Sequence, residues 1–87
     1  MPMWHLYLVR CNDGSLYTGI STDVQRRLAA HGASRGARRL RGRGPLELVY
    51  TQAVGDRSQA LRIEYRVKKL SRAEKERLIR RESSLPV

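Results

Sequence analysis

A β-hairpin signal near the N-terminus constrains the fold of this chain more than any other stretch. Residues 4–10, WHLYLVR, and residues 15–20, SLYTGI, are apolar runs rich in aromatic and branched side chains, and the turn-forming sequence CNDG lies between them. Such runs around an Asp-Gly pair predict two antiparallel strands joined by a tight turn. The fold therefore has to be built on an antiparallel sheet.

The length of this turn decides which side chains share a face of the hairpin. A two-residue loop, Asp13-Gly14, would place Tyr7 and Tyr17 on opposite faces. A three-residue loop, Asn12 to Gly14 with Gly14 left-handed, pairs Val9 with Tyr17 and puts both tyrosines on one face. The opposite face then collects the leucines of the hairpin, Leu6, Leu8 and Leu16. Because register follows the apolar pattern, we expect the three-residue turn.

A helix and a third strand are predicted after the hairpin. Thr22, as an N-cap with Gln25 completing a capping box, should begin a helix that runs to about residue 30 or 31, before Gly32. Residues 46–54, LELVYTQAV, alternate as a strand does. This alternation would place Leu46, Leu48 and Tyr50 on one face.

Two more helices complete the predicted domain. The first, from about residue 59 to 70, buries a stripe at helical spacing that consists of Ala60, Ile63, Val67 and Leu70. Ser71 with Glu74 forms a capping box, so the second runs from about residue 72 to 81. The order ββαβαα predicts an α+β fold, a small three-stranded antiparallel sheet flanked by helices. Residues 1–82 form one domain in this interpretation, and residues 83–87 a frayed tail.

Composition excludes several classes of protein. No stretch approaches the 18 or so apolar residues of a membrane span, and the N-terminus lacks the regions of a signal peptide, so we expect a soluble, cytoplasmic protein. Cys11 is the single cysteine, so it has no intrachain disulfide partner. With only two histidines, His5 and His31, the chain cannot assemble a Cys/His zinc cluster. A metal would need mainly oxygen ligands.

The charge of the chain points to a polyanionic partner. Eighteen Lys and Arg against eight Asp and Glu give a net charge of +10. The excess gathers in residues 32–46, with five arginines and no acid, and in residues 59–82, with nine basic and four acidic residues. This distribution favours nucleic acid over a membrane or an acidic protein. The candidate phosphate contacts are Arg35, Arg38, Arg39, Arg41, Arg43, Arg66, Lys68, Lys69 and Arg72.

Five polar residues are candidates for chemistry, and each also has a purely structural interpretation. Glu64 pairs with Lys68 at helical i,i+4 spacing, yet its carboxylate could also hold Mg²⁺. Tyr7 and Tyr17 are typical half-buried sheet residues, yet on one face they could relay a proton. Arg27, with His31 four residues later on the same stripe, could present donors to a phosphate. Convergence on one point would make these residues a site.

The order and spacing of these residues resemble those of the GIY-YIG nuclease domain. Tyr7 stands in HLY where the family has GIY, Tyr17 stands in YTG where it has YIG, and Arg27 follows ten residues later. His31 comes four residues after that, and Glu64 lies in the helix after the third strand. The likeness covers residues 4 to about 70. YTGISTDVQRRLAAH and VGDRSQALRIEYRVKKL resemble the small stand-alone bacterial members, a family catalogued as uncharacterised.

This resemblance implies hydrolysis of a DNA phosphodiester with one Mg²⁺ or Mn²⁺ and no small-molecule cofactor. By this resemblance Glu64 would bind the metal and Arg27 would contact the scissile phosphate. Tyr7 and Tyr17 would position or deprotonate the attacking water, with His31 assisting, and which tyrosine is the base stays open. A chain this short has little surface for recognising a long base sequence. We therefore expect the structure of the DNA to direct cleavage, as in repair or recombination.

The sequence departs from the family pattern at two places, and two other functions are therefore alternatives to a nuclease. Ile20 follows the YTG glycine where many members have a polar or basic residue, and Asn12 in the turn is the only asparagine, whereas many members carry one after the glutamate helix. One alternative is a nucleic-acid-binding module with weak or no catalysis. Another is a subunit that docks on RNA or a ribonucleoprotein.

Overall fold

The elements of the computed structural model follow the predicted order ββαβαα. The structure describes residues 2–32 and 46–86. The elements are β1 (Trp4–Arg10), β2 (Leu16–Ser21), α1 (Val24–Gly32), β3 (Glu47–Gly55), α2 (Arg57–Lys68) and α3 (Arg72–Ile79). All strand pairs are antiparallel and the sheet order is β2-β1-β3. The predicted α+β class and three-stranded sheet are confirmed.

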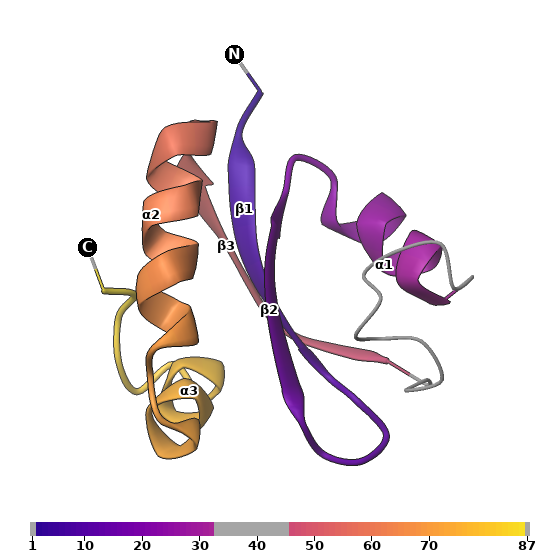
Figure 1. The fold of residues 1–87 in the computed structure, drawn as a ribbon, viewed down its shortest axis with the longest axis vertical. Coiled ribbons are helices and arrows are strands. Elements are labelled where there is room, and N and C mark those ends of the chain that lie inside the picture. The colour runs from indigo at the N-terminus through magenta and orange to yellow at the C-terminus, as the bar shows by residue number, and fades with distance from the viewer. Residues whose placement is uncertain (1, 33–45, 87) are drawn as a thin grey trace.

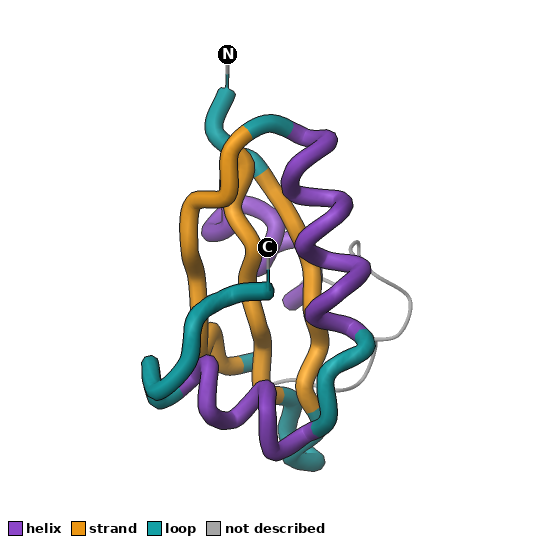
Figure 2. The backbone as a smooth tube through the Cα atoms, turned by 90° about the vertical axis from the view of Figure 1, so that its left-hand side faces the viewer, coloured by secondary structure: helices purple, strands orange, loops and turns teal. Residues whose placement is uncertain are grey.

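The helices lie on both sides of this sheet. Figure 1 shows α1 on one side and α2 on the other, with β2 between them at the edge. Figure 2 shows α2, α3 and the C-terminal segment together on one side. Among the described helices, none has the length and apolar character to cross a bilayer. The edge strand β2 is thus the place where side chains from both helical layers can meet.

The hairpin adopts the three-residue turn. Val9 pairs with Tyr17 and Tyr7 with Gly19. The Gly14 N–H donates to the Cys11 carbonyl, the Cys11 N–H donates to the Ser15 carbonyl, and Gly14 has a φ of +85°. This left-handed glycine closes a type I turn and fixes the register that places both tyrosines on one face.

The third strand differs from the predicted regular alternation. Leu8 pairs with Tyr50 while the next residue, Val9, pairs with Leu48, so a β-bulge leaves Val49 as an extra residue. Leu48 therefore faces α1, whereas Tyr50 lies in the core on the other side. The prediction that Leu48 and Tyr50 share a face was wrong, because a bulge reverses the alternation of side chains along the strand.

The core fills the space between the sheet and the α2/α3 layer. It contains Leu6, Leu8, Tyr50, Ile63, Val67, Leu78 and Leu85. The predicted stripe of α2 is buried at Ala60, Ile63 and Val67, and Leu70 packs partly against the core. Leu85 was expected in a frayed tail, yet it is 7% exposed. Burial of its side chain holds this part of the tail against the sheet.

Capping side chains set the helix starts. The Asp23 Oδ1 accepts from the Arg26 N–H at 3.1 Å, so Asp23, and not Thr22 as predicted, caps α1. Asp56 caps α2 in a reciprocal box with Gln59, which begins this helix two residues earlier than predicted. The predicted box of Ser71 and Glu74 at α3 is confirmed.

Candidate active site

The site is built around Tyr7 on the central strand. Its side chain is 1% exposed and crosses β2 above Gly19, its partner in the register. A Cβ at position 19 would lie 2.5 Å from the Tyr7 Oη and 2.6 Å from Cζ. Only a glycine leaves room for the phenol to pass at this point. Tyr7 thus extends from β1 over the edge strand.

Tyr17 lies beside Tyr7 on the same face of the hairpin. The ring centroids are 6.5 Å apart and the ring planes are tilted by 43°. Tyr17 is half-buried, in contrast to the fully buried Tyr7. The two phenols form a tilted aromatic pair at the sheet edge, which is the shared face that the hairpin register predicts.

Arg27 of α1 contacts Tyr7, and Glu64 of α2 acts on Tyr7 through its charge. The Arg27 guanidinium hydrogen-bonds the Tyr7 hydroxyl, and the Glu64 carboxylate is close enough to act on it electrostatically. Burial raises the pKa of Tyr7 to about 12, helped by Tyr17 and Glu64 and opposed by Arg27. The structure therefore brings together four of the five candidate residues, from four different elements, around one phenol that stays protonated at neutral pH.

Glu64 also makes the ion pair that its spacing predicts. Its Oε2 lies 3.6 Å from the Lys68 Nζ, and the two side chains are 19% and 53% exposed. The structural interpretation of Glu64 is thus confirmed, and it holds together with the approach to Tyr7. An exposed lysine is a replaceable partner, because a surface ion pair of this kind is worth about 0.3–0.5 kcal/mol.

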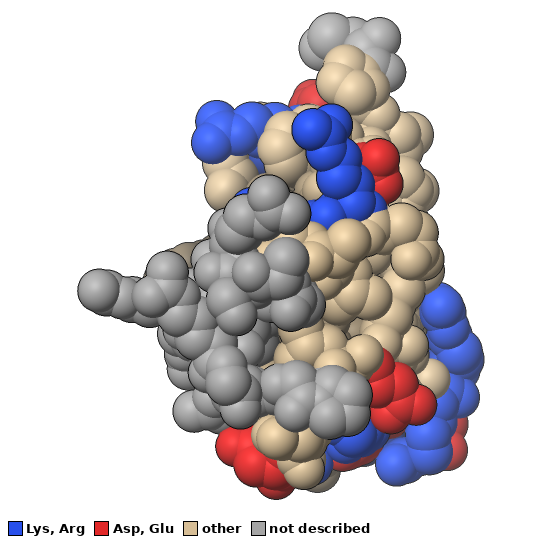
Figure 3. All heavy atoms as spheres, turned by 90° about the vertical axis from the view of Figure 1, so that its right-hand side faces the viewer, with Lys and Arg blue, Asp and Glu red and all other residues tan. Residues whose placement is uncertain are grey.

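The structure describes only some of the remaining candidate residues, which are His31 and the predicted phosphate contacts. His31 lies in the last turn of α1 as a backbone position, and its side chain lies outside the described residues. The five arginines of residues 32–46 also lie outside the described residues. Arg66, Lys68, Lys69 and Arg72 are exposed on α2 and at the start of α3. On the α1 side, Figure 3 shows Lys and Arg in separate groups with uncharged surface between them.

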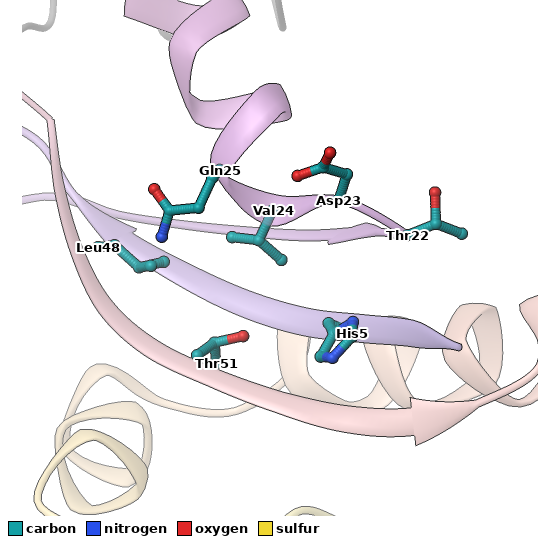
Figure 4. A pocket seen from close by; sticks show the side chains of 7 residues that line it. All are labelled: His5, Thr22, Asp23, Val24, Gln25, Leu48 and Thr51. Carbon is teal, nitrogen blue, oxygen red and sulfur yellow. The ribbon is translucent and has the colours of Figure 1, made fainter. Parts of the chain in front are cut away.

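Two features of this region did not emerge from the sequence. One is the role of Gly19, which the register could have indicated, because it lies directly opposite Tyr7. The other is a hollow of about 320 Å³ beside the start of α1, where His5, Asp23, Gln25 and Thr51 meet two apolar side chains. Figure 4 shows these side chains around it. The His5 Nδ1 is buried with no hydrogen-bond partner among the described residues.

Comparison with known proteins decides the family. The model of the GIY-YIG catalytic domain matches residues 3–77. The chain belongs to the GIY-YIG family. GIY-YIG domains form a nuclease superfamily, so the family implies a nucleic-acid partner in general.

Small bacterial GIY-YIG relatives share most of the chain. A UPF0213 protein of Serratia proteamaculans (strain 568) is 60% identical over 79 residues, which are 91% of this chain and 78% of the relative. A UPF0213 protein of Yersinia pestis (strain Pestoides F) is 60% identical over 77 residues, 88% of this chain and 81% of the relative. The predicted likeness to small stand-alone bacterial members is confirmed.

Solved structures share the fold of this GIY-YIG chain. The solution NMR structure of a UPF0213 protein from Bacillus halodurans is 48% identical, with a TM-score of 0.57 over 88% of this chain and 82% of the other. An NMR structure of a protein from E. faecalis is 35% identical, with a TM-score of 0.65 over 92% and 85% of the two chains. The fold is thus common to these relatives.

Proposed function

We propose that this GIY-YIG protein is a divalent-metal-dependent endonuclease that hydrolyses DNA phosphodiester bonds and selects DNA by structure. The observation that carries the proposal is that Tyr17 packs beside Tyr7, Arg27 hydrogen-bonds the Tyr7 hydroxyl, and Glu64 is near enough for its charge to act on Tyr7. Two phenols, a guanidinium and a carboxylate supply proton handling, phosphate binding and a metal ligand, which phosphodiester hydrolysis requires.

The donor set fits one Mg²⁺ or Mn²⁺ that binds together with its substrate. Within the described residues, no group of three or more His, Cys, Asp or Glu could hold a metal alone. Mg²⁺ needs only one or two protein carboxylates when phosphate oxygens and waters supply the remaining ligands. Glu64 would provide this carboxylate after separating from Lys68. The chemistry that a bound ion supplies is stabilisation of charge on the leaving oxygen.

The chain's own residues divide the remaining work. Arg27 already donates to Tyr7, and its planar fork has further N–H groups for a phosphate oxygen. Tyr7, with its pKa near 12, would act as a protonated phenol that orients Arg27 and the attacking water. Tyr17, the more exposed of the two tyrosines, would then act in its phenolate form, take the proton from the attacking water and become a neutral phenol. Positive charge fixed by α1 stabilises the negative charge that develops on the phosphorus substituents.

The first test measures cleavage of labelled single-stranded, duplex and branched DNA with Mg²⁺, Mn²⁺ or EDTA. We expect the wild type to cut only with metal, Glu64→Gln to lose cutting, and Tyr17→Phe to cut about 10²-fold more slowly, because it lacks the proton acceptor. Glu82→Gln is the matched control, because Glu82 is an exposed glutamate that pairs with Arg80 and not with the site. Undiminished cutting by Glu64→Gln would contradict the proposal.

A non-catalytic nucleic-acid-binding module is the second candidate. The Glu64–Lys68 ion pair favours it, because this contact neutralises the only carboxylate that the described structure brings to Tyr7. Salt-dependent DNA binding without cutting under every metal condition would support the module over the enzyme.

A further inference from the structure

The outer surface of α2 carries an exposed aromatic side chain. Tyr65 is 62% exposed, and Leu61, one helical turn earlier, is 42% exposed. The two side chains are four residues apart, so they are neighbours on the helix surface. They lie outside the core, because α2 packs against the core through Ala60, Ile63 and Val67. Tyr65 and Leu61 therefore form a small apolar patch that the fold itself does not use.

Cations surround this patch. The Lys69 Nζ lies 4.4 Å from the centroid of the Tyr65 ring. Arg62 and Lys68, three residues to either side of Tyr65, are exposed on the same surface. A cation–π contact involves only one face of a ring, and Tyr65 remains 62% exposed despite this contact. The resulting surface offers a flat π-face beside three positive charges, which complements an anion that carries flat rings.

The patch is adjacent to the candidate active site on the same helix. Tyr65 directly follows Glu64, and successive helical residues are separated by about 100° around the axis, at 3.6 residues per turn. Lys68 links the two, since it pairs with Glu64 and lies one turn from Tyr65. A strand that leaves Glu64 across α2 therefore passes Lys68 before it reaches the Tyr65 ring.

We propose that Tyr65, with Lys69 beside it, stacks an unpaired nucleobase of the DNA substrate next to the cleavage site. The proposal rests on the proposed function and names the substrate class as DNA with a single-stranded segment. Stacking on an exposed ring requires a base face that no neighbouring base covers, so a duplex interior offers none and a blunt end offers only its terminal pair, whereas flaps, gaps and overhangs offer unpaired bases. Every base has a π-face, so such stacking is tolerant of sequence.

The charge around the patch favours a nucleic acid over a protein partner. Stable protein interfaces bury about 800 Å² per partner around an apolar centre with few charges. Here two apolar side chains lie among Arg62, Lys68 and Lys69, and all three lie in the strongly basic segment of a chain with a net charge of +10. Alternation of an aromatic ring with cations is the pattern that single-stranded nucleic acid binds.

The test compares binding of a fluorescent oligothymidylate and of a blunt duplex by anisotropy, in EDTA so that no strand is cut. We expect Tyr65→Ala to weaken oligothymidylate binding about tenfold and to change duplex binding less than twofold, because the loss is one stacked base. Tyr65→Phe and Tyr65→Trp should keep wild-type affinity, since both retain a ring. Met3→Ala is the control for loss of an exposed apolar side chain, since Met3 is 51% exposed outside α2.

Fluorescence provides a readout that does not depend on affinity. The chain has one tryptophan, Trp4, so in Tyr65→Trp a second indole reports the patch directly. We expect oligothymidylate to quench the emission of Tyr65→Trp and to leave that of the wild type unchanged. An RNA oligomer of the same length shows whether the platform accepts both sugars. Quenching by oligothymidylate supports the stacking role, and quenching by the RNA oligomer alone would contradict DNA as its ligand.

The outcomes separate this proposal from the proposed function. Equal oligothymidylate affinity of Tyr65→Ala and the wild type, with no quenching in Tyr65→Trp, would overturn the platform even if the wild type cuts DNA. Loss of binding in Tyr65→Ala, in a protein that cuts nothing under any metal condition, would support the platform while the endonuclease fails.

Discussion

Tyr7 reaches its partners in the site because residue 19 has no side chain. The phenol lies over Gly19, and any Cβ there would contact both Oη and Cζ at 2.6 Å or less. Contacts that short cannot be accommodated in a buried strand without moving the ring, because protein cores are packed as densely as crystals. The position of the Tyr7 hydroxyl, and with it the Arg27 contact, therefore depends on this glycine.

Gly19→Ala is expected to displace the Tyr7 phenol. We expect the free energy of unfolding to fall by about 1–3 kcal/mol, the usual cost of overpacking. The pKa of Tyr7 should also fall from about 12 toward its ordinary value of 10.0, because a displaced ring loses the burial that raises it. Denaturant unfolding and an ultraviolet titration of the tyrosines measure the two effects.

The adjacent residue provides the control for Gly19→Ala. Thr18 is buried and its hydroxyl has no hydrogen-bond partner in the described residues, so Thr18→Val should keep or slightly raise the free energy of unfolding. It should leave the titration of Tyr7 unchanged, because successive residues of a strand face opposite sides of the sheet and Thr18 precedes the residue that lies opposite Tyr7. A Gly19→Ala protein with wild-type stability and titration would refute the steric role of this glycine.

At the scale of elements, α1 positions Arg27 through its capped first turn. The Asp23 side chain accepts from the Arg26 N–H, and the Arg27 N–H donates to the Asp23 carbonyl at 3.0 Å. Loss of a cap carboxylate costs about 1 kcal/mol and frays the first turn. In α1 this turn carries a residue of the candidate site, whereas the first turn of α3 carries none of the catalytic candidates.

Removal of each cap in turn separates stability from positioning. We expect Asp23→Ala and Ser71→Ala each to lower the free energy of unfolding by about 1 kcal/mol, since both side chains cap a helix. Only Asp23→Ala should also slow DNA cleavage, because it loosens Arg27. Thermal melting and the cleavage assay give the two values. Equal cleavage rates for the two variants would show that the cap does not position Arg27.

How far the elements follow from sequence depends on whether the signal is local. The hairpin turn at Gly14 and the Ser71–Glu74 box are set by neighbouring residues, and both are as predicted. The bulge at Val49 was missed because LELVY fits a regular strand, and only pairing with β1 shows the extra residue. The burial of Leu85 was missed for a related reason, because its partners lie far away in the sequence.

The candidate site follows the same division. Tyr7, Tyr17 and Arg27 could be predicted from their spacing in the sequence. The hairpin register places the two tyrosines on one face, and Arg27 lies in the helix that follows directly. The approach of Glu64 to Tyr7 could be inferred only from the family, because α2 comes from beyond the third strand. The exposure of Tyr65 had no sequence signal, since a helical tyrosine beside an apolar stripe is equally compatible with burial.

At the scale of the whole molecule, one ion pair joins the hairpin to α3. The Arg10 guanidinium makes two hydrogen bonds to the Glu76 carboxylate, at 3.0 and 2.9 Å, across 66 residues of sequence. Both side chains are partly shielded, with 28% and 23% exposed, and Arg72 lies 3.4 Å from the same carboxylate. The hydrogen bonds from Arg10 lower the pKa of Glu76 from 4.5 to about 2, with Arg72 contributing less.

This pKa predicts how the stability of the domain depends on pH. Because the folded pKa lies below the unfolded value, the native state binds fewer protons and the contribution of Glu76 is complete above about pH 5. It is lost as the pH falls from about 4.5 to about 2. Glu76→Gln should lower the free energy of unfolding at pH 7 by about 1 kcal/mol, the scale of a charged hydrogen bond that solvent partly screens.

Below the folded pKa of Glu76 the difference between the wild type and Glu76→Gln should close. Denaturant unfolding at intervals between pH 7 and pH 2 measures the two curves, and Arg10→Gln should follow Glu76→Gln, because either change removes the same contact. Glu82→Gln is the matched control, since the Glu82–Arg80 pair is more than half exposed and should leave the curve of the wild type unchanged. Parallel curves for the wild type and Glu76→Gln across this range would mean that the pair does not tie the hairpin to α3, and that the buried contacts of Leu78 and Leu85 hold the two layers together without it.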